Sequence, residues 1–404
     1  MRPAASPRPS ALPRAYWVVW AGTLVNRVGT FVEPFLVLYL TQERGLSPSQ
    51  AGWVLAAYGV GSLPSQPIGG WLADHLGRRR TLLLATLAAA AALLLVGAAR
   101  STGAIAAASL LLGFFGDMYR PASSALVADV VAPEDRPRAY ALLFWAINLG
   151  FSVAGVTAGV LASRGFGLLF LVDALTFAAF GVLVYVMIRR DPPRDLWGAP
   201  DTEPSGRGYG VVLRDGLMLR LCAITAVHAV VYFQGLIVLP LATSAAGLSL
   251  TAYGVIAATN GLVIVVVQPL VAARLRRHDR LRVAALAMVV MGIGFGLTAF
   301  ASSLAGFIAT VVVWTLGEVL LAGIPPALVA ELAPADARGR YQGVFGLSFS
   351  IAFVLAPLLG TSVYERSGDL LWALCLALSL AAGAGFMALR RPLAARAADP
   401  AARN

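Results

Sequence analysis

Residues 70–80 read Gly-Trp-Leu-Ala-Asp-His-Leu-Gly-Arg-Arg-Arg and lie where one long apolar run, 51–72, ends and the next, 81–99, begins. The segment brings an aspartate, a glycine and three arginines together, so the chain turns here at a charged surface. A helix needs about 20 apolar residues to cross the hydrocarbon core of a bilayer, and both flanking runs are that long. The segment therefore predicts two membrane-spanning helices joined by a short charged loop.

The composition of the whole chain is that of a protein embedded in lipid. Hydrophobic residues make up 59% of the 404 residues, charged residues only 13%, and the mean hydropathy is +0.78. A soluble domain carries roughly 25% charged residues. These values exclude a soluble enzyme, a disordered protein and a disulfide scaffold, and both cysteines, Cys222 and Cys375, lie inside apolar runs. The three histidines are scattered, so we expect no metal site and no bound cofactor.

Twelve apolar stretches are long enough to span, which predicts an all-α membrane protein with twelve transmembrane helices. The expected spans are 15–40, 51–72, 81–99, 104–128, 139–162, 167–188, 219–243, 251–273, 283–302, 305–330, 341–363 and 370–389. Residues 189–218 are polar and rich in Pro and Gly, so they predict a linker between two bundles, 15–188 and 219–389. Residues 1–14 and 390–404 are expected to be tails, with no cleaved signal peptide.

The distribution of basic residues predicts the orientation of the chain. All 31 basic residues are arginines, and 25 of them lie in the N-terminus, in every second loop and in the C-terminus. The opposite loops hold only Arg44, Arg100, Arg164 and Arg366. Cytoplasmic loops are enriched in Arg and Lys, so we expect both termini in the cytoplasm and the protein in the inner membrane of a bacterium. The net charge of +11 is then a topology signal and not evidence of nucleic-acid binding.

The two halves of the chain repeat each other at an offset of about 202 residues. A repeat that keeps its orientation in the membrane needs an even number of spans, here six, and the two units are then related by an axis along the membrane normal. The matching segments are Gln66-Pro67 with Gln268-Pro269, 125–129 (ALVAD) with 327–331 (ALVAE), Arg136-x-Arg138 with Arg338-x-Arg340, and Gly116-Asp117 with Gly317-Glu318.

These features resemble the major facilitator superfamily. Residues 70–80 are similar to its signature G-x-L-a-D-[RK]-x-G-[RK]-[RK], with His75 where a basic residue is usual, whereas 272–282 keep the charge but lack the glycines and the acid. Residues 117–122 resemble the arginine-bearing fourth helix of the drug:proton antiporters, without the usual R-x-x-x-G spacing. Gly150, Gly155 and Gly159 resemble a degraded antiporter signature that lacks its Gly-Pro pair.

The resemblance implies two pseudo-symmetric six-helix bundles that rock around a site at mid-membrane. It also implies a monomeric secondary transporter whose partners are a small-molecule substrate, protons and the lipid bilayer. The glycines of 139–162 would let helix backbones approach closely during rocking.

The charged loops are candidates for a conformational latch that holds the cytoplasmic face shut. Asp74 and Arg78 lie on a tight loop that needs Gly77, and their partners would lie at the ends of neighbouring helices. The alternative is ordinary solvation of loop charges with compensation of the helix ends. The candidate latch residues are Gly70, Asp74, Gly77, Arg78, Asp129, Arg136, Glu331 and Arg338.

Ionisable side chains inside the spans are the candidates for the substrate and proton site, because each costs roughly 2.5–3.5 kcal/mol at bilayer depth. At about 1.5 Å per residue, Arg27 lies ~18 Å into the first span and Glu33 ~27 Å. Asn26, Thr30 and Glu33 share a helical stripe, and Pro34 should kink the helix. The candidate site residues are Asn26, Arg27, Glu33, Asp117, Arg120, His228 and Glu318.

Burial favours the protonated form of a carboxylate, and a nearby arginine favours the ionised form. Glu33, Asp117 and Glu318 could therefore carry protons, with Arg120 as a counter-ion for Asp117. The alternative is a set of static pairs, such as Asp117 with Arg120 or Arg27 with Asp117. In 305–330, Pro325-Pro326 should break the inner end. Asp173, near the outer end of 167–188, is expected to be interfacial.

The function favoured by these residues is proton-coupled export of small amphipathic or drug-like compounds. Arg27 and Arg120 would also suit an anion, so uptake or uniport of a sugar, peptide or organic acid is the alternative. We expect neither an enzyme nor a receptor, since the chain carries no phosphate-binding P-loop and no Ser/His catalytic set.

Overall fold

The computed structural model describes residues 12–188, 209–275, 278–334 and 337–398, and all regular structure in these ranges is helical. The first half consists of α1 (Arg14–Val28), α2 (Val32–Leu38), the π-helical turn η1 (Tyr39–Glu43), α3 (Pro48–His75), α4 (Arg78–Ala98), α5 (Thr102–Val130), α6 (Arg136–Ala162) and α7 (Gly167–Met187). The second half consists of α8 (Gly210–Leu213), α9 (Gly216–Ile237), α10 (Leu239–Ala245), α11 (Leu250–Leu275), α12 (Arg280–Leu297), the 3-10 turn η2 (Thr298–Phe300), α13 (Leu304–Leu321), α14 (Ile324–Leu332), α15 (Arg338–Arg366), α16 (Gly368–Ala388) and α17 (Arg390–Ala398).

Ten helical segments of the described residues, from α4 to α16, are long and apolar enough to cross a membrane. The first two expected spans are not among them. Residues 14–43 are divided into α1, α2 and η1, and α3 carries polar and turn-forming residues, including Pro64 and Pro67, along its 28 residues. The N-terminal sequence at 1–11 and most of the expected linker, 189–208, lie outside the described residues.

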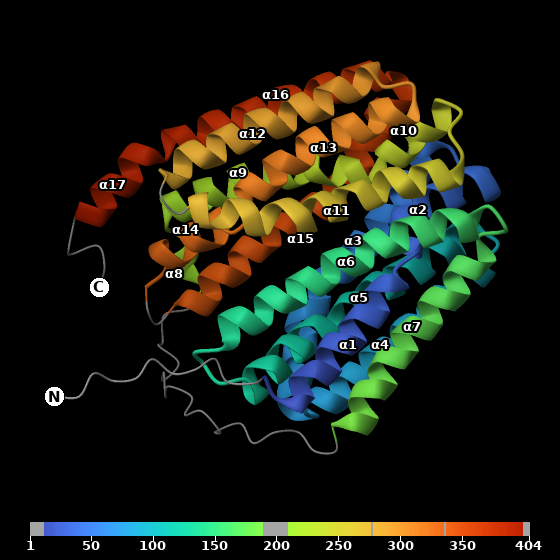
Figure 1. The fold of residues 1–404 in the computed structure, drawn as a ribbon, viewed down its shortest axis with the longest axis horizontal. Coiled ribbons are helices and arrows are strands. Elements are labelled where there is room, and N and C mark those ends of the chain that lie inside the picture. Colours follow the sequence, from blue (N-terminus) through green and yellow to red (C-terminus); the bar gives the residue numbers. More distant parts are fainter. Residues whose placement is uncertain (1–11, 189–208, 276–277, 335–336, 399–404) are drawn as a thin grey trace.

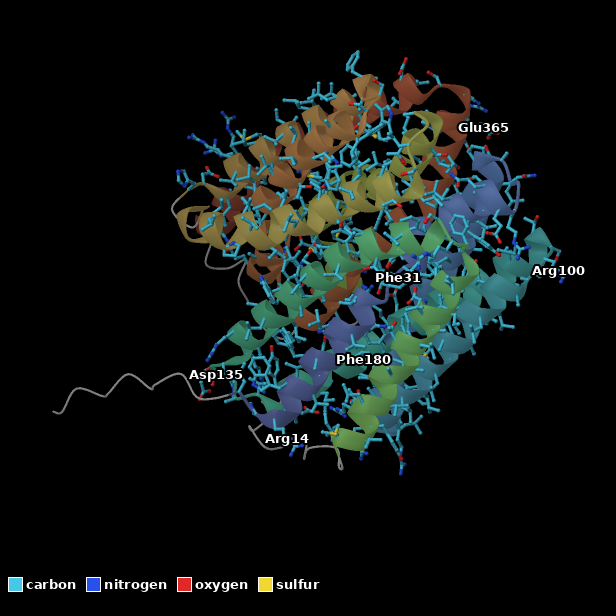
Figure 2. All side chains as sticks on the ribbon, turned by 45° about the vertical axis from the view of Figure 1, so that its right-hand side comes forward. Arg14, Phe31, Arg100, Asp135, Phe180 and Glu365 are labelled. Atoms are coloured by element: carbon cyan, nitrogen blue, oxygen red, sulfur yellow. The ribbon has the colours of Figure 1, made fainter. Side chains whose placement is uncertain are left out.

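The helices run between two ends of the molecule. We call the end where α1, α4, α6, α9, α12 and α15 begin the basic end, because it carries the arginines of the alternate loops, and the other the opposite end. Figure 2 shows Arg14 and Asp135 at the basic end and Arg100 and Glu365 at the opposite end. The first described helix, α1, begins at the basic end. The last described helix, α17, lies at the same end.

Turn residues explain where several helices start. Gly77 has a φ of 88°, a backbone angle that residues with a side chain rarely adopt, and α4 begins at the next residue. Ser47 and Gln50 form a capping box at the start of α3. Asp215 caps α9, and Asp279 caps α12, by accepting bonds from backbone N–H groups of the first turn.

The first span is broken in its middle. The α-helix leaves off at Val28 and resumes at Val32, so Asn26, Thr30 and Glu33 do not lie on one continuous helix as expected. Pro34 lacks the N–H that would bond the carbonyl of Thr30, and this places the break one turn before the proline. The expected span 305–330 is also broken. Ala322 and Gly323 (φ 79°) separate α13 from α14, which carries Pro325 and Pro326 in its first turn.

The two halves lie against each other at the opposite end and diverge toward the basic end, as Figure 1 shows for the blue-to-green and yellow-to-red helices. Glycines of α6 form one contact with α11: a Cβ on Gly155 would lie 2.9 Å from the nitrogen of Ala258, and one on Gly159 would lie 2.7 Å from the carbonyl of Leu250. Gly150 instead faces Arg27 of α1. The expected close approach at these glycines is therefore present, and two of them serve the contact between halves.

Hydrogen bonds also join the halves at the opposite end, and Thr251 of α11 donates one of them to the carbonyl of Gly159 at 3.3 Å. Gln42 donates to Ser244 at 2.9 Å, and Ser49 donates to Glu365. Deeper in the molecule, Tyr253 donates to the carbonyl of Pro34 at 3.0 Å. In this conformation the opposite end is the closed end.

We expect Gly254→Leu to open this contact, because a Cβ at Gly254 would overlap the backbone carbonyl of Gly155. Overpacking of this kind costs about 1–3 kcal/mol, which shifts a two-state population by about 5- to 150-fold. Spin labels at the exposed positions Arg100 and Ser302, in a chain with Cys222 and Cys375 replaced by serine, should report longer distances across the opposite end. Gly346→Leu is the control, since a Cβ there meets nothing within 4 Å. An unchanged distance in Gly254→Leu would contradict the packing argument.

The sequence after 389 is not merely a tail, because residues 390–398 form α17 and its arginines bind the second half. Arg396 donates to Asp215 at 2.7 Å and to the carbonyl of Leu332 at 3.2 Å, and Tyr341 donates to the same carboxylate at 2.8 Å. Arg390 donates to Asp279, the cap of α12, at 2.7 Å. The last described helix thus ties together the basic ends of α9, α12, α14 and α15.

We expect Arg396→Ala or Asp215→Asn to cost about 1.5–3 kcal/mol of unfolding free energy, the usual value for a hydrogen bond to a charged group. Burial raises the pKa of Asp215, but the bonds from Arg396 and Tyr341 outweigh it and hold the pKa below its ordinary value of 3.8. The stabilisation should therefore be full above about pH 4 and be lost as the pH falls below that value. Thermal unfolding in detergent from pH 3 to pH 8 measures this, and the exposed Arg391→Ala is the control. An equal loss in Arg391→Ala would contradict it.

Candidate functional site

Two adjoining cavities lie in the middle of the molecule. The first has an empty volume of about 710 Å³ and is lined mainly by the first half, and the second has about 620 Å³ and is lined mainly by the second half. Glu33 and Leu236 border both, so the two cavities meet at the break between α1 and α2.

The first cavity contains most of the ionisable residues expected for the site. Arg27, Glu33, Asp117 and Arg120 line it, together with Tyr119. Arg120 pairs with Asp117 at 2.9 Å, one turn away on α5, and the side chain of Arg120 is 47% exposed although it lies at mid-depth. Arg27 donates to the hydroxyl of Tyr119 at 2.9 Å, so the pair of Arg27 with Asp117 considered from the sequence is not the one the structure forms.

The second cavity has aromatic rings in its wall, and Glu318 lies beside it. Asn260 of α11 donates to Glu318 at 2.8 Å and to Thr315 at 3.0 Å, which fixes the Glu318 side chain beside this cavity. Among the described residues its lining has no arginine and consists of aromatic and aliphatic side chains with Gly235, Asn260 and Glu33. The aromatic lining residues are Phe151, Tyr232, Phe233, Tyr253 and Trp314.

Two candidate residues lie away from the cavity walls. Asn26 is 1% exposed, and its amide nitrogen has no hydrogen-bond partner in the structure. His228 is 8% exposed and lies in α9, where its ring is 6.2 Å from that of Tyr232. Neither side chain borders the cavities, so either would act on a ligand through a neighbour.

Asp173 is not interfacial, which corrects the expectation from the sequence. It is 2% exposed and lines the first cavity together with Arg27 and Glu33. Its Oδ2 accepts hydrogen bonds from the backbone N–H groups of Phe31 at 3.2 Å and Val32 at 3.0 Å. The estimate of depth from the end of the span failed because the break in the first span turns free backbone donors toward α7.

Sequence reasoning also missed two residues that occupy equivalent places in the two halves. Tyr58 lines the first cavity and Asn260 the second, and they are 202 residues apart. Both are uncharged, so a search for buried charge passed over them. A search for polar residues at repeat-equivalent positions would have found the pair.

The candidate latch residues form matching ion pairs in the two halves. Arg78 pairs with Asp129 at 2.9 Å and with Asp74 at 3.4 Å, and Arg280 pairs with Glu331 at 2.5 Å. Arg280 and Glu331 each follow their counterparts, Arg78 and Asp129, by 202 residues, so segment 272–282 keeps this pairing although it lacks the signature glycines.

The other latch candidates have backbone roles or lie beyond the described side chains. Arg136 donates to the carbonyls of Ala128 and Val131 and so closes the end of α5. A Cβ on Gly70 would meet nothing within 4 Å. Arg338 begins α15, but its side chain lies outside the described residues. All the pairs named here join helices within one half, and a latching role stays a prediction.

No group of three or more His, Cys, Asp or Glu side chains that could hold a metal ion occurs among the described residues. What the cavities offer is carboxylates, two arginines, hydroxyls and aromatic rings. Such a set can bind a charged amphipathic molecule and exchange protons with water.

Comparison with known proteins identifies the family. The Major Facilitator Superfamily model matches residues 19–357 and, in a second overlapping match, 221–404. The chain belongs to the major facilitator superfamily. As a member of that superfamily it is a multi-pass membrane transporter and not an enzyme.

The similarity to two relatives and to one solved structure extends over most of the chain. It is similar to the Na(+), Li(+), K(+)/H(+) antiporter of Planococcus maritimus, at 25% identity over 81% of this chain and 84% of the relative. It is also similar to the multidrug resistance protein MdtH of Aeromonas salmonicida (strain A449), at 25% identity over 86% and 87%. The crystal structure of a peptide transporter POT in complex with sulfate has the same fold, with a TM-score of 0.80, 18% identity, and 96% and 97% of the two chains covered.

We expect Asp129→Asn to slow transport without changing the order of substrate preference, because it breaks a pair between the start of α4 and the end of α5 and not at the cavity. The side chain of Asp129 is 14% exposed, whereas that of its repeat counterpart Glu331 is 54% exposed. Exposed pairs contribute only about 0–1 kcal/mol, so Glu331→Gln should have the smaller effect. Initial transport rates and competition between substrates measure both. A changed substrate preference in Asp129→Asn would place this loop in the binding site.

Proposed function

We propose that this transporter exports small amphipathic compounds, cationic or neutral, in exchange for protons. The observation that carries the proposal is the pair of adjoining cavities with Glu33 at their junction, Asp117 on the wall of the first, and Glu318 held beside the second by Asn260. A transporter that alternates between two openings can load a proton or a substrate at such a group and release it on the other side. The similarity to MdtH and to a cation/proton antiporter favours exchange.

The residues divide the work between the halves. Asp117 pairs with Arg120 at 2.9 Å, so a proton or a substrate that binds Asp117 must compete with the arginine. Glu318 is held by the neutral Asn260 and has no arginine partner among the residues that contact it in the structure, so it gains a proton more easily. The aromatic wall of the second cavity would hold the apolar or cationic part of the substrate.

We further propose twelve membrane crossings, with α1–α2 and α3 as the first two. Polar and broken segments are tolerated at membrane depth where they line a cavity and not the lipid, as α1 and α2 do here. The arginine-rich basic end would face the cytoplasm of a bacterium, with both chain ends on that side. The conformation is then closed on the outer face.

Uptake or uniport of a peptide, sugar or organic acid is the second candidate function. The observation in its favour is that Arg27 and Arg120 both line the first cavity, where they could bind a carboxylate. The fold shared with a peptide transporter is compatible with it but does not by itself indicate a substrate.

The test is exchange in inside-out vesicles that carry a proton gradient reported by a pH-sensitive dye. Tetraphenylphosphonium, dialanine and NaCl are added separately. Collapse of the gradient by tetraphenylphosphonium supports export of amphipathic cations. A response to dialanine alone supports the peptide alternative, and a response to NaCl alone supports cation exchange; either result would overturn the proposal.

We expect Glu318→Gln and Asp117→Asn to lower gradient-driven exchange by about tenfold or more, which needs only ~1.4 kcal/mol of added barrier. Neither substitution changes side-chain volume greatly, so both variants should reach the membrane in normal amounts. Asp369→Asn is the matched control, because Asp369 is an exposed carboxylate at the opposite end. Normal exchange in both cavity variants would show that the proton site lies elsewhere.

A further inference from the structure

The break between α1 and α2 frees backbone donors at membrane depth. An unsatisfied N–H in a non-aqueous environment costs several kcal/mol, so a break is tolerated only where the protein supplies partners. Phe31 also donates to the carbonyl of Gly29 at 2.8 Å, but the N–H of Val32 finds its acceptor in Asp173 alone among the bonds of the structure. One oxygen of a side chain on α7 thus caps a helix on a different segment of the chain.

The packing of α7 against the break makes this contact specific. Gly29 lies so close to Thr176 that a Cβ there would overlap the threonine side chain. Thr176 in turn donates to the carbonyl of Asp173 at 2.9 Å. The backbone at the break can therefore approach Asp173 only because residue 29 is glycine.

The second oxygen of Asp173 is free. Oδ1 is buried and has no hydrogen-bond partner in the structure, and the residue borders the first cavity. A proton arriving from cavity water would add to Oδ1 and leave Oδ2 as the carbonyl oxygen of a neutral acid. Neutral hydrogen bonds are roughly half as strong as those to an ionised carboxylate, so the cap on α2 would weaken without being lost.

Weakening this cap affects both the cavity and the closed end. Glu33, which borders both cavities, directly follows the capped Val32. The next residue, Pro34, accepts the hydrogen bond from Tyr253 of the other half, and Gln42, one turn past α2, donates to Ser244. The orientation of α2 thus sets the position of Glu33 and contributes two of the bonds between the halves.

We propose that Asp173 is a positioning residue that links a proton in the first cavity to the closed end of the transporter. When ionised, it holds α2 and Glu33 in the arrangement seen here. When protonated, it releases α2 and allows the two halves to part at the opposite end. This inference rests on the proposed function only in taking a proton as the signal. Asp173 is not one of Glu33, Asp117 and Glu318, the carboxylates predicted to carry protons.

Other charged groups face Asp173 and could compete for the same role. Arg27 on α1, Glu33 on α2 and the ion pair of Asp117 with Arg120 on α5 line the cavity with it, and Tyr58 on α3 and Tyr119 on α5 are the tyrosines of that wall. The contribution of α4 to the wall is the apolar Leu93, and that of α7 beside Asp173 is Phe177. Glu33 is therefore the group that the experiment must separate from Asp173.

The experiment measures the closed end directly and needs neither substrate nor gradient. Spin labels at Arg100 and Ser302, in the full chain with both cysteines replaced, report the distance across the opposite end in lipid nanodiscs from pH 5 to pH 9. In the wild-type background we expect a shift toward longer distances as the pH falls. Asp173→Asn keeps an acceptor for the two N–H groups but cannot be ionised, so it should give the low-pH distances at every pH.

Matched variants make the result decisive. Asp173→Ala removes the acceptor and should open the closed end further than Asp173→Asn; if it does not fold, Asp173→Asn alone still decides the question. Asp369→Asn should keep the wild-type response to pH. A pH response that persists in Asp173→Asn, or that disappears in Glu33→Gln but not in Asp173→Asn, overturns the proposal, as does a wild-type background that does not respond to pH. Failure of proton exchange in the vesicle assay, with this response intact, would instead refute the proposed function.

Discussion

Polar groups at membrane depth must find their partners inside the protein, and this requirement explains most of the arrangement around the cavities. Helices satisfy their own backbone, so all regular structure of the described residues is helical. Where the helix is broken, at 29–31, a carboxylate from α7 accepts the freed donors. The part-buried side chain of Asn260 follows the same rule, since it donates to Glu318 and Thr315.

Much of the fold could be predicted from the sequence because the two halves of the chain repeat each other. An offset of 202 residues predicted equivalent loops, and the structure places Arg78 with Asp129 and Arg280 with Glu331 at that same offset. The expected span 81–99 corresponds closely to α4, since a long apolar run between charged loops has few alternatives. The breaks at Gly29 and Gly323 were harder to predict, because proline signals a break only to within about a turn.

The candidate site was predicted in part. Buried charge identified Arg27, Glu33, Asp117, Arg120 and Glu318, which lie at or beside the two cavities. It could not identify Asp173. A count of residues along 167–188 gives the depth of Asp173 but does not show that the first span is broken beside it and offers it free backbone N–H groups. The docking of α17 was hidden for a related reason: Arg396 and Asp215 are 181 residues apart, and short arginine-rich sequences usually indicate no more than a solvated end.

The contact between the halves is well suited to being broken and remade. At Gly155, Gly159 and Gly254, two helices meet backbone to backbone, so the attraction is mainly dispersion, which falls steeply with distance. No ion pair of the described residues joins α6 to α11, whereas a buried pair would have to be desolvated again on every return. Directional bonds between the halves are few: Tyr253 to Pro34, Gln42 to Ser244, Ser49 to Glu365, and Thr251 to the carbonyl of Gly159. Two of these bonds involve Pro34 of α2 and Gln42 just past it, so a small change at the start of α2 alters part of the directional attraction that holds the closed end.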